Sequence, residues 1–256
     1  MDKNDLTKLA ESGRFIPGIY NYCDRWCERC PVTSRCLTFA VTNELCADRD
    51  SLDIQNAAFW QHLAETLQMA ADLLRKRAEE LGVDLDSVTG EELAEEEKRT
   101  EEARNHECCL MAKRYAEIVE EWFGSGMAEG ENAGRVGGGV GLQQALAVIR
   151  WYQHQISIKL LRAIRSDSED RTEIADDLPR DAVAQAKIVL IGIDRSIAAW
   201  GVVRKRLRAP DDEVLDLMVH LDRLRSGVEK VFPDARALVR PGFEAIDLDS
   251  SCARDC

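Results

Sequence analysis

Apolar residues recur along most of the chain at intervals of three and four, which is the spacing of one face of an α-helix. No stretch alternates apolar and polar residues as a half-buried strand would. The pattern predicts five long helices, over about 51–81, 89–123, 142–166, 181–208 and 210–231, after a shorter helix from about 33 to 46. The predicted fold class is therefore all-α, a helical bundle.

The first long helix is predicted to begin at Ser51 or Asp53 and to end at Gly82, a residue that commonly terminates helices. Thr89 is predicted to cap the second long helix, and only the part of that helix after His106 is apolar enough to be well buried. The apolar stripe of the first long helix, expected to belong to the bundle, comprises Ile54, Ala58, Phe59, Leu63, Leu67, Ala70, Leu74 and Leu81.

The most apolar run of the sequence is 188–193, directly before Asp194 and Arg195. Charges interrupt this segment too often for it to cross a bilayer, so we predict the central helix of the bundle. Two charged residues in such a helix must pair or line a cavity, and an ion pair is favoured over a catalytic role.

The chain has a formal net charge of −13, and residues 79–107 hold twelve acids against three bases. Nucleic acids and anionic membranes need a basic surface, so neither is an expected partner. The acidic region is predicted to be a solvated helix face, with docking of a basic protein as the alternative.

The clearest chemical signal is a group of four thiols within fourteen residues: Cys23, Cys27, Cys30 and Cys36. Thiolates this close in sequence can surround one zinc ion or one [4Fe–4S] cluster. The nine cysteines are an odd number, and the N-terminus lacks the pattern of a secretory signal. We therefore expect a cytoplasmic protein in which these cysteines bind a metal centre rather than form disulfides.

The segment from Cys27 to Cys36, Cys-x2-Cys-Pro-x4-Cys, resembles the end of the cluster loop in DNA glycosylases of the endonuclease III type. Similar loops occur in iron–sulfur nucleases and in auxiliary-cluster domains of some radical enzymes. Cys23-x3-Cys27-x2-Cys30 also resembles the radical S-adenosylmethionine motif, although Arg29 stands where that motif has an aromatic residue. These resemblances favour a [4Fe–4S] cluster, with zinc as the alternative, and imply nothing about the fold.

Other candidate ligands are weaker. The paired Glu-x-x-His pattern of di-iron bundles is absent, although His62 lies three residues before Glu65, and His106 lies near Glu102, Cys108 and Cys109. Cys46 is an alternative ligand, and Cys252 and Cys256 repeat the spacing of Cys23 and Cys27. For the histidines, Cys108, Cys109 and Cys46 a structural role is the favoured interpretation, and for Cys252 and Cys256 it is that of thiols in a disordered tail.

The sequence is predicted to divide into a cysteine-rich metal-binding segment (1–48), a helical bundle (49–240) and a flexible tail (241–256), with the glycine-rich stretch 124–141 as a mobile connection. The expected function is redox sensing or electron transfer through the four-cysteine centre. Two alternatives stay open: a structural-zinc interaction protein without catalysis, and a metalloenzyme with its site near His62, His106 and Asp194. A redox partner or a basic protein is the expected partner, and the sequence does not determine the oligomeric state.

Overall fold

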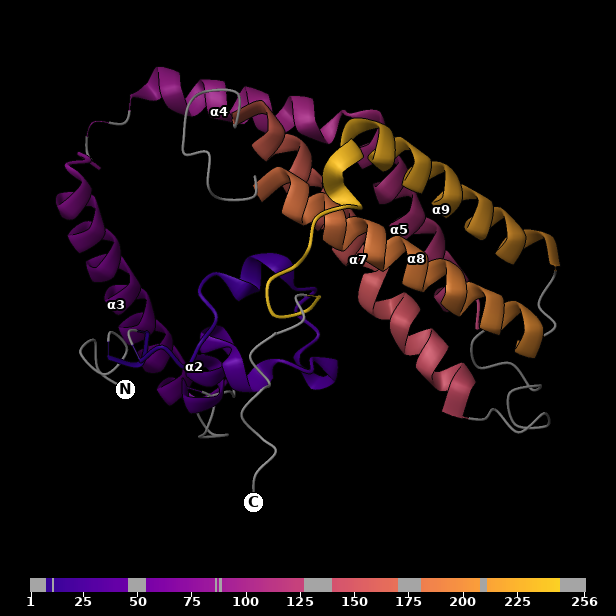
Figure 1. The fold of residues 1–256 in the computed structure, drawn as a ribbon, viewed down its shortest axis with the longest axis horizontal. Helices are drawn as coiled ribbons and strands as arrows, with labels where there is room; N and C mark the ends of the chain where they lie inside the picture. Colours follow the sequence, from indigo (N-terminus) through magenta and orange to yellow (C-terminus); the bar gives the residue numbers. More distant parts are fainter. Residues whose placement is uncertain are drawn as a thin grey trace, which may run out of the picture. The chain divides into compact units, whose positions relative to one another are not determined.

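The computed structural model describes residues 8–10, 12–45, 54–85, 87, 89–126, 140–169, 181–207 and 211–244. All regular structure in these residues is helical and none of them lies in a strand, which confirms the predicted all-α class (Figure 1). Within the same ranges, no helix is both long enough and apolar enough to cross a membrane.

The number of long helices is larger than predicted. Six described helices have fifteen residues or more, against the five expected from the sequence. With the shorter α2, the α-helices are α2 (Leu37–Leu45), α3 (Ala57–Leu81), α4 (Gly90–Arg104), α5 (Glu107–Gly124), α7 (Val140–Glu169), α8 (Asp181–Leu207) and α9 (Asp211–Val231).

The additional helix arises because the predicted helix 89–123 is broken between α4 and α5. Asn105 turns its side-chain amide back onto the carbonyl oxygen of Glu101 at 2.9 Å. His106 then adopts an extended backbone (φ −63°, ψ 137°), and its Nδ1 accepts the backbone N–H of Cys108 at 3.2 Å. A side chain that caps a helix competes with the helical hydrogen-bond ladder, so the chain starts a new helix here.

The predicted end of the first long helix is confirmed and its predicted start is wrong. Gly82 has the left-handed conformation (φ 67°) that terminates α3, and glycine adopts it without steric cost. At the other end, Asn56 is the cap, since its Oδ1 accepts the N–H of Ala58 at 3.1 Å. The proposed caps Ser51 and Asp53 lie outside the described residues.

The structure divides into two compact units, which are described separately. The first unit contains the described residues of Met1–Tyr20, Cys27–Glu97 and Pro241–Cys256, and the second contains Asn21–Trp26 and Lys98–Arg240. The division predicted from the sequence, into 1–48, 49–240 and 241–256, stays a prediction, and most of its last segment lies outside the described residues.

The second unit is a helical bundle. Helices α5, α7, α8 and α9 form a ring of packed neighbours, because α7 contacts α5 and α8, and α9 contacts α8 and α5 (Figure 1). The three-residue 3₁₀ helix η5 (Pro233–Ala235) follows α9 and packs on it and on α8.

Large side chains at the predicted helical spacing fill the interior of this bundle. Fully buried members come from all four helices: Tyr115, Val119, Ile149, Tyr152, Ile156, Leu160, Leu190, Ile193, Trp200, Leu221 and Leu224. Trp200 Nε1 in this interior donates to the Tyr115 hydroxyl at 3.1 Å, whereas the buried Trp122 Nε1 has no hydrogen-bond partner in the described residues. The bundle therefore has one continuous core, which the apolar stripes predicted for 142–166, 181–208 and 210–231 provide.

The first unit contains short turns, α2 and α3. The 3₁₀ helix η3 (Thr33–Arg35) precedes α2, close to the predicted helix start, and the Arg35 carbonyl oxygen accepts the N–H of Ile16 at 3.0 Å. Phe15 and Ile19 are buried. The apolar stripe of α3, by contrast, is largely exposed.

Candidate metal centre

The segment Asn21–Trp26, which carries the first cysteine of the motif, is bound to the bundle of the second unit. Gln185 Nε2 donates to the Asn21 carbonyl oxygen at 3.2 Å, and the Arg240 guanidinium donates to that of Tyr22 at 3.3 Å. Trp151 Nε1 donates to the Asp24 carbonyl oxygen at 3.1 Å. These backbone contacts fix the path of the segment across α7 and α8.

The Asp24 carboxylate makes further contacts, both within its own turn and with the bundle. One oxygen accepts the Trp26 backbone N–H at 3.2 Å and closes a turn in which Arg25 has a positive φ of 61°. The other accepts from the Arg195 guanidinium at 2.8 Å and from the Tyr152 hydroxyl. A non-glycine residue with positive φ is strained, and here the surrounding contacts of Asp24 hold it in place.

Trp26, inside the cysteine motif, packs on the bundle. Its ring stacks on Trp151 with centroids 5.0 Å apart and meets Tyr152 edge-on at 6.2 Å. Such aromatic pairs add stability beyond their buried area. The sequence predicts that Trp26 docks the loop on the helical body, and the structure confirms this contact.

Cys23 is half-buried in this anchored segment. Its sulfur accepts the backbone N–H of Arg25, and the ammonium group of Lys159 lies close enough to interact with it electrostatically. Burial raises the pKa of the Cys23 thiol, and the Arg25 hydrogen bond and nearby positive charges oppose that rise. The pKa of Lys159 is lowered, mainly by burial, and its Nζ donates to Gln185 Oε1 at 2.9 Å.

The other three cysteines belong to the first unit. Cys27 begins the 3₁₀ helix η2 (Cys27–Arg29), and its carbonyl oxygen accepts the N–H of Cys30 at 3.2 Å. Cys36 directly precedes α2, and its sulfur accepts the N–H of Phe39 at 3.4 Å. That sulfur therefore accepts a hydrogen bond from the first turn of α2, at the capping position of the helix.

None of the four motif cysteines forms a disulfide, and each is partly exposed. In the described ranges, no three His, Cys, Asp or Glu side chains are close enough together to hold a metal ion. Four thiols are a donor set that suits a soft metal or a cluster. Two of the four sulfurs, those of Cys23 and Cys36, accept backbone N–H donors.

The remaining cysteine and histidine candidates have structural environments. Cys108 and Cys109 are buried in the bundle, and burial raises the pKa of Cys109 to about 12, so its thiol is unreactive at neutral pH. His106 caps α5, as described above. Cys46, Cys252, Cys256 and the side chain of His62 lie outside the described residues.

Asp194 and Arg195 form ion pairs, but with different partners. Asp194 accepts from Arg236 and from Arg225, the latter at 3.4 Å, and Arg195 pairs with Asp24. Burial alone would raise the pKa of Asp194, but the hydrogen bonds and charges of the two arginines outweigh it and lower the pKa. The favoured ion-pair interpretation of both residues is therefore confirmed.

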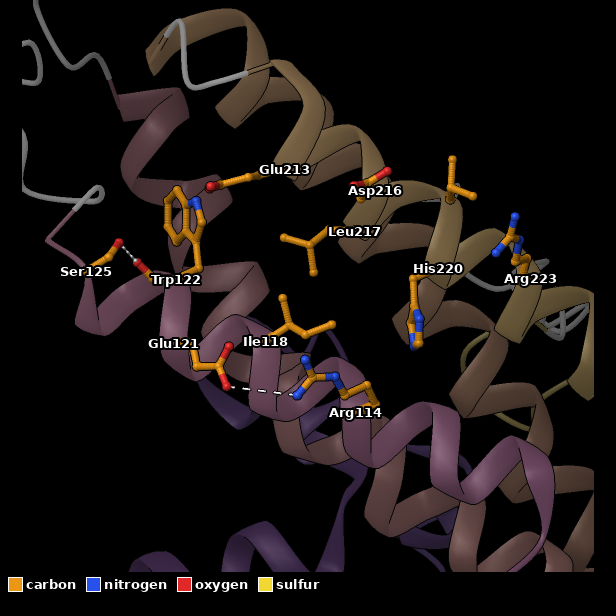
Figure 2. Close-up of a pocket in the computed structure, with 11 residues that line it drawn as sticks. Arg114, Ile118, Glu121, Trp122, Ser125, Glu213, Asp216, Leu217, His220 and Arg223 are labelled. Carbon is orange, nitrogen blue, oxygen red and sulfur yellow. Dashed lines mark hydrogen bonds and ion pairs between the residues drawn. The ribbon is translucent and has the colours of Figure 1, made fainter.

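The bundle also has a pocket of about 570 Å³ between α5 and α9, which the sequence did not indicate (Figure 2). Its lining combines the acidic Glu121, Glu213 and Asp216 with Arg114 and Arg223. Trp122 lies at one end, and its buried Nε1 has no hydrogen-bond partner in the described residues. Arg114 of this lining lies 3.9 Å from Glu121.

Comparison of the chain with protein-family models, with curated proteins and with solved structures finds no match. The class that the fold defines is an all-α helical-bundle protein. Any function must be argued from the chain's own residues.

Proposed function

We propose that this protein binds a [4Fe–4S] cluster through Cys23, Cys27, Cys30 and Cys36 and acts in electron transfer or redox sensing. The observation that carries the proposal is the close sequence spacing of four partly exposed thiols, at the spacing that the resemblance to cluster loops also favours. The first of them is positioned by the anchored segment Asn21–Trp26.

Positive charge around the motif supports this proposal. Four thiolates and an iron–sulfur core carry a net negative charge, which neighbouring cations offset. Arg25, Arg29 and Arg35 lie within the motif, and the half-buried Cys23 is also close to Lys159. Hydrogen bonds to the sulfurs, such as those from Arg25 and Phe39, are among the protein's means of setting a cluster potential.

Structural zinc is the second candidate, and the Cys27–Cys30 turn favours it. A Cys-x2-Cys pair in a tight turn commonly supplies two of the four ligands of a zinc site. In that case the protein has no redox role, and the metal stabilises the fold of the N-terminal loop for interaction with a partner. The two candidates share their ligands and differ in the metal they bind.

The test is anaerobic purification of the full chain, followed by its visible spectrum and by iron, zinc and sulfide analysis. The cluster predicts a broad absorption band that changes on reduction, with about four irons and four sulfides per chain. Cys30→Ser should remove the band and most of the iron. The matched control is Cys109→Ala, which removes a buried thiol outside the motif and should leave both unchanged.

Each alternative result is equally informative. One zinc per chain without colour would establish the zinc candidate and exclude the redox role. A protein that takes up neither metal after anaerobic reconstitution would refute both. A band that survives Cys30→Ser but is lost in Cys109→Ala would place the metal elsewhere.

A further inference from the structure

Helix α3 exposes an unusually regular apolar seam. Trp60, Leu67, Leu74 and Leu81 recur at every seventh residue, and between 55% and 61% of each residue's surface is exposed. Leu63 adds a further exposed leucine on the same side. No other described element packs extensively against α3. Exposed apolar surfaces of this extent commonly mark an interaction site.

The seam is symmetric about the midpoint between Ala70 and Ala71. Leu67 and Leu74 are equally distant from this midpoint, as are Leu63 and Ala78, and Trp60 and Leu81. Because a helix turns by about 100° per residue, these eight positions fall within one stripe of about 100°. Reversing the direction of α3 therefore superimposes the apolar stripe on itself.

We propose that α3 pairs with α3 of a second copy of this chain in an antiparallel dimer centred between Ala70 and Ala71. Such an interface is self-complementary, as two-fold symmetry requires. It places Leu67 against Leu74 of the partner subunit and Trp60 against Leu81 of the partner subunit. The alanines at the centre allow the two helices to approach closely.

The charges beside the seam select the antiparallel direction. Arg77 borders the seam and is exposed, as is Arg75 on its other side. A parallel pair would bring these arginines next to the same arginines of the second copy, and like charges in a helix interface are destabilising. The antiparallel pair places Arg77 opposite Ala64 of the partner subunit and separates the two basic groups.

The polar residues of α3 leave the seam clear. Gln61 bonds to Glu65 at 3.0 Å, Gln68 to Asp72 at 3.0 Å, and Lys76 pairs with Glu80 at 3.8 Å. All six of these residues lie on the flanks or back of the helix by its angular spacing, and the two ends are capped by Asn56 and Gly82. The chain thus supports α3 as a helix while most of its apolar stripe is exposed. Ala78 is the one seam residue that is already buried.

The test measures the mass of the full chain in solution by sedimentation equilibrium, with the cysteines kept reduced. The unmodified protein should have twice the chain mass of 28.8 kDa. Leu67→Glu and Leu74→Lys should each raise the dimer dissociation constant at least tenfold. Combined in one chain, they should restore dimerisation, because each introduced glutamate then faces an introduced lysine of the second copy.

The matched control is Lys76→Glu, which makes a larger charge change on the opposite face of α3 and should leave the dimer intact. Far-UV circular dichroism of each variant checks that the helices are retained. A monomeric unmodified protein at high micromolar concentration would overturn the proposal, and so would a dimer unaffected by Leu67→Glu. Loss of the dimer in the double variant as well as in both single variants would overturn the antiparallel register.

Discussion

Asp24 is the residue through which the cysteine motif is connected to the bundle of the second unit. Its two carboxylate oxygens and its carbonyl oxygen together accept hydrogen bonds from Trp26, Tyr152, Arg195 and Trp151. The side chain is mostly shielded from water, and a charged group with several donors in such a place is strongly stabilised. The cysteine that precedes Asp24 is therefore held in a defined position.

A second residue with clear electrostatic consequences is Asp194. Arg236 and Arg225 lower the pKa of its carboxyl group despite partial burial. We predict that Asp194→Asn destabilises the protein by about 1 kcal/mol at neutral pH, a modest value because the pair is partly exposed and screened by solvent. The measurement is urea unfolding of both proteins as a function of pH.

The sign of the pH dependence follows from the lowered pKa. The ionised carboxylate stabilises the folded state, so its contribution is complete above the ordinary pKa of 3.8 and disappears as the pH falls through the lower folded-state value. The difference in the free energy of unfolding between the wild type and Asp194→Asn should therefore vanish in acid. If this difference grew on acidification, the ionised Asp194 carboxylate would not be the group that stabilises the folded state.

At the level of elements, the closest approach in the bundle is between α7 and α8. Gly192 lies against Tyr152, and a methyl group at that position would come within 2.9 Å of the tyrosine ring. Gly201, further along α8, has open space at the same position. Two glycines on one helix therefore have opposite roles: Gly192 is required for packing, and Gly201 is not.

We predict that Gly192→Ala destabilises the protein by about 1–3 kcal/mol, because the added methyl group overpacks the interface with α7. Gly201→Ala is the matched control and should be neutral or stabilising by up to about 1 kcal/mol, since alanine has the higher helix propensity. Chemical denaturation of both variants measures the difference. Equal effects would show that α8 is not held against Tyr152.

Two elements show where sequence periodicity succeeded and where it did not. Of the apolar stripe predicted for α9, Val214, Leu217, Leu221, Leu224 and Val228 are buried, whereas Val231 at its end is 36% exposed. The stripe of α3 has an equally regular pattern, yet it is exposed in the described chain. Periodicity identifies an apolar face, but it does not identify the surface that covers that face.

At the scale of the whole molecule, the bundle core and three of the motif cysteines belong to different units. The core residues lie in α5, α7, α8, α9 and the segment after α9, whereas Cys27, Cys30 and Cys36 belong to the first unit. The stability of the core should therefore be largely independent of the metal. Loss of the proposed metal centre should therefore leave the bundle folded.

We predict that the combined substitution of Cys27, Cys30 and Cys36 by serine shifts the main thermal unfolding transition by no more than about 2 °C. Leu190→Ala, in the fully buried core, should by contrast lower the free energy of unfolding by about 2–5 kcal/mol. Both are measured by far-UV circular dichroism. A large shift for the cysteine variant would show that the bundle depends on the metal centre.

The sequence by itself determined the all-α class, most helix ends and the buried faces of α7, α8 and α9, because these depend on local hydrogen bonding and on the 3.6-residue period. It also identified the four motif cysteines and the need of Asp194 and Arg195 for partners. Which partners they have was decided only by tertiary structure, because Asp24 and Arg195 are 171 residues apart in the chain.

The break at His106, the exposure of α3 and the pocket beside Trp122 were not predicted from the sequence. At His106, one capping hydrogen bond outweighed an otherwise continuous helical pattern. In the other two cases, the result depends on which surfaces meet in space. Local sequence fixes the faces that a helix can bury, and only the packing of distant segments determines which of those faces become interior.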